Sequence, residues 1–116
     1  MQFLCLIYEA ESLMAAQSDE EKGQIFQEYM TYTDDIKSSG HFVAGDALEP
    51  TSTATTIRIR NGERVLTDGP FAETKEQLGG YYLLECDSLD EAIEQASRIP
   101  SAKLGSIEVR PIMVFN

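Results

Sequence analysis

The stretch that decides the fold is Gly80–Glu91, GYYLLECDSLDE, in which an apolar run leads directly into a helix start signal. Residues 80–86 have the length and the large apolar side chains of a strand that is covered on both faces. Ser88 and Glu91 then have the S-x-x-E spacing of a capping box, which predicts a helix that Pro100 stops. The stretch is therefore a strand followed at once by a helix.

The same unit occurs at the start of the chain. Residues 3–8, FLCLIY, form an apolar run of strand length, and a polar, alanine-rich connection leads to a second capping box at Ser18–Glu21. Apolar residues spaced four, three and four apart follow this box: Ile25, Tyr29, Tyr32 and Ile36. This pattern predicts a helix over residues 19–38, closed by Gly40 in a left-handed conformation.

A β-hairpin is predicted between the two units. Residues 55–60, TTIRIR, alternate apolar and basic side chains, Asn61-Gly62 is the strongest short turn signal, and residues 63–67 return as a second strand. The loop over 72–78 is either one short helical turn or an ordered loop. A last strand is expected over residues 107–115, where a proline without a backbone donor indicates a sheet edge or a bulge.

The order of strand, helix, hairpin, strand, helix and strand predicts an α+β fold, as one domain over residues 1–116. It is a ferredoxin-like split β-α-β sandwich with an extra β-hairpin. Both helices would cover one face of the sheet and leave the other face apolar and bare. Because small domains rarely expose such a patch, we expect a twofold homodimer of the dimeric α+β barrel type, with the sheets face to face.

Charge and hydropathy exclude several classes of partner. The net charge of −11 argues against direct nucleic-acid binding, which needs a basic stripe. No apolar run approaches the ~18 residues of a membrane span, and the first residues lack a secretion signal, so a cytoplasmic location without membrane contact is expected. Residues 1–50 carry ten acids against Lys22 and Lys37, whereas residues 51–116 carry ten acids against seven bases.

Three segments together resemble a known family: ATTIRIRNGERVL (54–66), TDGPFAETKEQLGGYYLLE (67–85) and RIPSAKLGSIEVRPIM (98–113). They are similar to the DGPF branch of the YCII-related proteins, and the likeness runs nearly end to end. The resemblance implies a ferredoxin-like homodimer with a small-molecule pocket near the dimer interface. It also implies a link to extracytoplasmic-function sigma factors, and, in enzymatic relatives outside this branch, a histidine–aspartate pair in a cleft.

Asp68 and His41 are the candidate catalytic residues. Asp68 precedes Gly69-Pro70 at a strand end, where an aspartate acts either as a turn residue or as a carboxylate base in a cleft. His41 is the one histidine, in a loop after the helix, where surface or packing roles are common. The sequence has no histidine within residues 19–38, so a pair with Asp68 requires that His41 faces it.

Four further residues are candidate ligand-binding groups: Tyr8, Arg58, Phe71 and Arg110. An arginine on a strand is either a guanidinium fork for an anion or the partner of a nearby glutamate such as Glu108. Aromatic residues on strands are usually core, although a tyrosine at a strand end can reach a pocket rim.

No cofactor or metal site is expected. One histidine and two separated, apolar-flanked cysteines, Cys5 and Cys86, cannot by their spacing supply the ligands of a zinc site. The two cysteines are interpreted as buried free thiols, although their number also permits a disulfide.

Two functions remain open. The first is a small-molecule pocket for an aromatic or carboxylate compound, with lyase- or hydrolase-like chemistry at Asp68. The alternative is a non-enzymatic regulatory or ligand-binding module associated with an extracytoplasmic-function sigma factor. The acidic helix over 19–38 would meet such a partner, although an acidic helix face is more often simply solvated.

Overall fold

The computed structural model describes residues 1–116. In chain order its elements are β1 (Gln2–Glu9), α1 (Glu11–Ala15), α2 (Asp19–Ser38), β2 (Phe42–Ala47), β3 (Thr55–Arg60), β4 (Glu63–Asp68), β5 (Gln77–Glu85), α3 (Leu89–Ser97) and β6 (Ser106–Pro111), with 3-10 turns at Thr51–Thr53 and Pro100–Lys103. Four strands form an antiparallel sheet in the order β2-β5-β1-β6, and β3 and β4 form a separate hairpin. This is the ferredoxin-like arrangement with an extra hairpin, so the predicted fold is confirmed.

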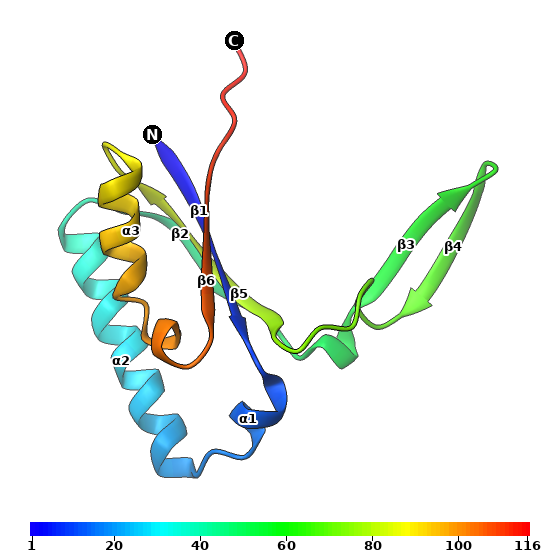
Figure 1. Ribbon diagram of the computed structural model, residues 1–116, viewed down its shortest axis with the longest axis horizontal. Helices are drawn as coiled ribbons and strands as arrows, with labels where there is room; N and C mark the ends of the chain where they lie inside the picture. Colours follow the sequence, from blue (N-terminus) through cyan, green and yellow to red (C-terminus); the bar gives the residue numbers. More distant parts are fainter.

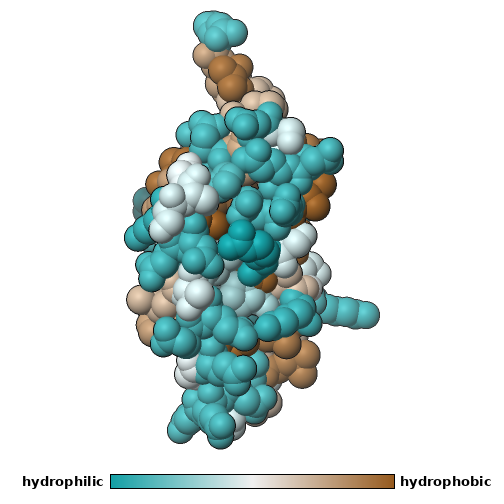
Figure 2. Space-filling view, turned by 90° about the vertical axis from the view of Figure 1, so that its left-hand side faces the viewer, coloured by the Kyte–Doolittle hydropathy of each residue, from teal (hydrophilic) through white to brown (hydrophobic).

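The core lies between the sheet and its two long helices, which cover the same face (Figure 1). Alternate residues of β1, namely Phe3, Cys5 and Ile7, point into this core and are 5% exposed or less. Tyr82 and Leu84 of β5 also point into this core and are 8% and 0% exposed. The outward side of the helical layer is mostly hydrophilic (Figure 2). None of the helices has the length and apolar character that crossing a membrane requires.

The buried Cys5 thiol makes stability sensitive to alkaline pH. Burial raises its pKa from 9.0 to about 11. As the pH rises, the unfolded chain therefore loses the Cys5 proton before the folded protein does. The contribution of this thiol to the free energy of unfolding is complete below pH 9.0 and is lost as the pH rises through about 11. We expect the free energy of unfolding to fall between about pH 8 and about pH 11, and to fall by about 2–3 kcal/mol less in Cys5→Ala than in the wild type. Denaturant titrations of both proteins at the two pH values measure this difference. The same pH dependence in both proteins would contradict this assignment.

The two predicted capping boxes differ slightly in how they are completed. At α2, Ser18 Oγ accepts from Glu21 N at 3.1 Å, and the Glu21 carboxylate accepts from Ser18 N at 3.0 Å. At α3, Ser88 Oγ accepts from Glu91 N at 3.1 Å. The predicted bounds of the first long helix, and Gly40 with a φ of +80°, are confirmed.

The structure corrects three local predictions. The loop predicted around His41 leads directly into a strand, Phe42–Ala47, and the polar connection before α2 contains the short helix α1. The last strand ends at Pro111 instead of continuing to Phe115. It is an edge strand, as Pro111 indicated.

The second face of the sheet carries no helix. Leu4 pairs with Leu83 and Leu6 with Tyr81, so four large side chains lie together at the centre of this face. The hairpin projects from the same side of the sheet (Figure 1). Its apolar side chains are 43–62% exposed: Ile57, Ile59, Val65 and Leu66.

Candidate functional site

A candidate site is a cavity of about 510 Å³ between α2 and the edge of the sheet formed by β2 and β5. Its volume lies within the range of small-molecule pockets in proteins. Half of the residues that line it are hydrophobic, and tyrosine and phenylalanine side chains are prominent among them. The cavity is therefore suited to a flat, largely apolar molecule with a few polar groups.

One face of α2 forms a wall of the cavity. The lining residues on this face recur at helical spacing: Lys22, Phe26, Tyr29, Thr33 and Lys37. This face partly overlaps the apolar stripe that predicted the helix from sequence. The sequence pattern therefore located the helix, but it did not reveal that part of the stripe faces an open space.

Two glycines shape the opposite wall. A Cβ atom on Gly45 of β2 would lie 2.6 Å from Cδ1 of Tyr82, and one on Gly80 of β5 would lie 2.9 Å from the Asp46 carbonyl oxygen. Both contacts are too close for a real side chain. The glycines therefore let β2 approach β5 and the Tyr82 ring closely beside the cavity.

Hydroxyl groups supply hydrogen-bond donors to the cavity. Ser101 Oγ donates to the Glu9 carboxylate at 2.5 Å, so the Tyr29 hydroxyl, 2.5 Å from Ser101 Oγ, must be the donor to it. Thr33 Oγ1 and the Tyr82 hydroxyl lie 2.7 Å apart. The contacts of Ser101 form a relay from the Tyr29 hydroxyl to the Glu9 carboxylate, while Thr33 and Tyr82 form a separate pair.

The tyrosines of the cavity stay protonated at neutral pH. Burial raises the pKa of Tyr29 to about 12 and also raises the pKa of Tyr82. The pKa of Tyr81 is raised because its hydroxyl donates to the Asp46 carboxylate at 2.6 Å. Tyr29 and Tyr82 are therefore neutral hydrogen-bond groups toward a ligand rather than anions, whereas the Tyr81 side chain points to the bare face of the sheet.

The two lysines are the positive groups of the cavity. Lys22 and Lys37 are the only lysines or arginines in residues 1–50, and both line it. Neither forms a salt bridge, whereas Lys103 pairs with Glu28 and Arg98 with Asp35. The Lys37 ammonium lies 5.0 Å from the centre of the Phe42 ring. Two carboxylates, those of Glu9 and Asp46, also line the cavity, and they accept hydrogen bonds from Ser101 and Tyr81 rather than from a lysine.

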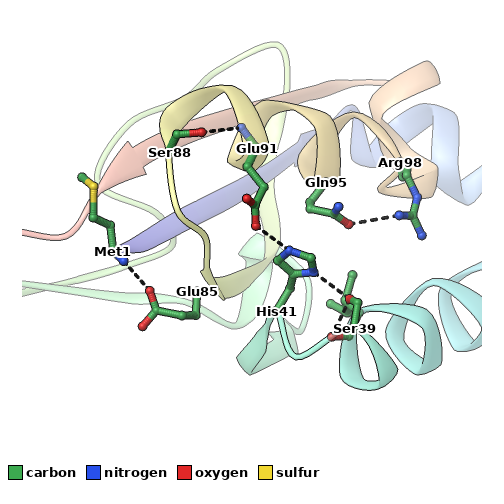
Figure 3. A network of polar contacts seen from close by, with 9 residues as sticks. Met1, Ser39, His41, Glu85, Ser88, Glu91, Gln95 and Arg98 are labelled. Atoms are coloured by element: carbon green, nitrogen blue, oxygen red, sulfur yellow. Dashed lines mark hydrogen bonds and ion pairs between the residues drawn. The ribbon is translucent and has the colours of Figure 1, made fainter.

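The two candidate catalytic residues lie in different parts of the fold. Asp68 is the exposed last residue of β4 in the hairpin, paired in register with Thr55. His41 lies between α2 and α3, where its ring contacts Ser39 and Glu91 at 2.6 and 2.7 Å (Figure 3). The structure therefore does not bring them together within one protomer, and neither lines the cavity.

The four candidate ligand-binding residues also lie outside the cavity lining. Tyr8 is at the end of β1 on the bare face, and Arg58 faces Val65 across the hairpin. Phe71 is 80% exposed in a loop. Arg110 on β6 pairs with Glu108 at 2.6 Å, which agrees with the structural alternative for this arginine.

Sequence reasoning missed the residues that do line the cavity. The charges could have indicated the cavity, because Lys22 and Lys37 lie fifteen positions apart on one face of the helix and all other charged residues in residues 1–50 are acidic. The tyrosines gave no such signal, because aromatic residues at helix and strand positions are usually core.

Comparison with known proteins agrees with this fold. A family model described as the YCII-related domain matches residues 1–116. An uncharacterised protein of Rhizobium meliloti (strain 1021) is 39% identical over 117 residues, covering 99% of this chain and 94% of that protein. The solved 5-chloro-2-hydroxyhydroquinone dehydrochlorinase of Burkholderia phenoliruptrix AC1100, in complex with 2,5-dihydroxybenzoquinone, matches with a TM-score of 0.55 at 16% identity, covering 97% of this chain and 94% of that one. At that identity the likeness shows a shared fold.

Proposed function

The chain belongs to the YCII-related family, and we propose that it is a homodimeric protein that binds a small anionic aromatic compound in the cavity between α2 and the β2–β5 edge. The observation that carries this proposal is the placement of Lys22 and Lys37. They line one aromatic cavity and have no carboxylate partner, in the half of the chain where acids outnumber bases by ten to two.

The chemistry of the cavity favours an oxygenated ring. Tyr29, Tyr82 and Thr33 offer neutral hydroxyls that can bond to ring oxygens, while the phenylalanine and tyrosine rings stack on its faces. The lysine ammonium groups balance a negative charge on the ligand, and such charge-assisted hydrogen bonds are stronger than neutral ones. A ring with acidic hydroxyls or a carboxylate satisfies both requirements.

A solved protein of the same fold gives a concrete probe. It is described as a dehydrochlorinase in complex with 2,5-dihydroxybenzoquinone. That compound is a flat ring whose two hydroxyls are acidic, so it is negatively charged at neutral pH. It therefore has the shape and the charge that the cavity of this protein is suited to accept.

For an enzymatic role, the relay to Glu9 replaces the predicted role of Asp68. A hydroxyl on the bound ring would donate its proton to Tyr29, Tyr29 would donate to Ser101, and Ser101 to the Glu9 carboxylate. This step is a proton abstraction, the first requirement of lyase-like chemistry on an oxygenated ring. The relay geometry supports this role, whereas Asp68 lies on the exposed hairpin.

The homodimer is proposed from the bare face of the sheet. Leu4, Leu6, Tyr81 and Leu83 form an apolar cluster there, on the side from which the hairpin projects. An isolated two-stranded hairpin is marginally stable in water, so the exposed apolar residues of β3 and β4 need a surface to pack on. A second copy, with its own bare face and hairpin, supplies that surface for both.

The proposal is tested by calorimetric titration with 2,5-dihydroxybenzoquinone. We expect Lys22→Gln and Lys37→Gln each to weaken binding by about tenfold or more, because each removes a charge-assisted hydrogen bond. Lys75→Gln, in an exposed loop outside the cavity, is the matched control and should bind like the wild type. Hydroquinone, which is uncharged at neutral pH, should bind weakly to all four proteins.

Two results would overturn the proposal. One is equal affinity of the two cavity variants and the wild type. The other is a loss of affinity in Lys75→Gln as large as in the cavity variants, because that would indicate non-specific attraction of an anion to positive charge.

A further inference from the structure

Three potential metal ligands meet at a second location, away from the cavity. His41, Cys86 and Glu91 have ligand atoms that all lie within 4.8 Å of one another, although His41 stands 45 positions before Cys86 in the sequence. This contradicts the expectation from sequence that no zinc-type cluster can form. The sequence argument failed because it considered spacing along the chain, and the fold brings together residues that spacing separates.

The backbone holds the three residues together. His41 immediately precedes β2, and its carbonyl oxygen accepts from Glu85 N at 2.8 Å, which places it beside the end of β5. Cys86 follows that strand directly. Glu91 lies in the first turn of α3, whose start is capped by Ser88. Figure 3 shows His41 reaching between Ser39 at the end of α2 and Glu91 on α3.

Hydrogen bonds orient the His41 ring toward the other two groups. Ser39 Oγ lies 2.6 Å from His41 Nδ1 and 3.2 Å from the Ile36 carbonyl oxygen. His41 Nε2 lies 2.7 Å from a Glu91 carboxylate oxygen, which is the distance of a hydrogen bond between the two side chains. A divalent metal ion bound to both groups would take the place of the proton in this hydrogen bond.

We propose that His41 Nε2, Cys86 Sγ and a Glu91 carboxylate oxygen form a binding site for Zn²⁺ or a similar divalent metal ion. Nitrogen, sulfur and oxygen donors together are the ligand set that zinc takes in proteins. Ser39 acts as the outer partner that orients the ring of a metal-bound histidine. The side chains of His41 and Glu91 are 16% and 31% exposed, so a metal ion can enter from solvent and a water molecule can occupy a fourth position.

Cobalt(II) titration of the metal-free protein tests this site. We expect one equivalent of Co²⁺ to produce the near-ultraviolet charge-transfer absorption of a cobalt–thiolate bond, and Zn²⁺ to abolish it by displacement. Cys86→Ser and His41→Gln should lose the absorption. Cys5→Ser, which changes the other buried thiol, should keep it.

A second pair of variants tests the site without altering the core. Glu91→Gln changes a partly exposed helix residue and should lower the affinity for Zn²⁺ by about tenfold or more. Glu94→Gln on the same helix is its control and should bind like the wild type. Absence of the charge-transfer absorption in the wild type, or its persistence in Cys86→Ser, would overturn the proposal and leave only a hydrogen bond between His41 and Glu91.

Discussion

Replacing Leu6 with aspartate should convert the protein from a dimer into a monomer. Leu6 lies at the centre of the bare face, in register with Tyr81 on one side and Glu108 on the other. A carboxylate there would be buried against the partner sheet and would lie beside existing acidic groups. A twofold interface contains two copies of the change, so a cost of about 2 kcal/mol each weakens the dimer by roughly a thousandfold.

Sedimentation equilibrium at micromolar concentration measures this effect. Met30→Asp is the control, because Met30 is 47% exposed on the helical layer and its replacement should leave the dimer intact. Circular dichroism should show that Leu6→Asp keeps its fold, since Leu6 points away from the core. A wild-type protein that sediments as a monomer would contradict the proposed dimer.

Replacing Gly105 with alanine should cause the largest loss of stability among single methyl additions. A Cβ atom at this position would lie 2.0 Å from the Tyr8 carbonyl oxygen and 3.2 Å from Glu9 Cα, and both belong to the backbone of β1. The start of β6 would have to move away from β1, where Ser106 pairs with Tyr8. We expect a loss of about 3 kcal/mol, or roughly 10–15 °C in melting temperature.

Gly23→Ala is the matched control for this prediction. Gly23 lies inside α2, and a Cβ atom there would meet nothing within 4 Å. Alanine should therefore stabilise the protein by about 0.5–1 kcal/mol, because it reduces the conformational freedom of the unfolded chain. Thermal denaturation of the two variants should shift the midpoint in opposite directions. A Gly105→Ala protein as stable as the wild type would contradict the close packing of β6 on β1.

The sequence predicted the elements that have strong local signals. The capping box at Ser18 fixed the start of α2, and Asn61-Gly62 gave the hairpin because both residues adopt positive φ values of 53° and 78°. The strand β2 gave no comparable signal. It contains Gly45 and Asp46, which are rare in strands, and it is held in place by pairing with β5 rather than by its own propensity.

The candidate sites were less predictable than the fold, because both depend on contacts between distant parts of the chain. Lys22 and Glu9 line the same cavity only because α2 packs over the end of the sheet. His41 meets Glu91 across fifty residues, whereas the pair considered from the sequence, His41 with Asp68, required that the two residues face each other. Local patterns predict elements, whereas sites arise where several elements converge.

A crystal structure of the protein with 2,5-dihydroxybenzoquinone is the most direct test of the central claim, that the cavity between α2 and the β2–β5 edge binds an anionic ring. We expect the ring inside this cavity, with its oxygen atoms about 3 Å from the Lys22 and Lys37 ammonium groups. A ring bound elsewhere, such as beside Asp68 on the hairpin, with the cavity filled only by water, would contradict it.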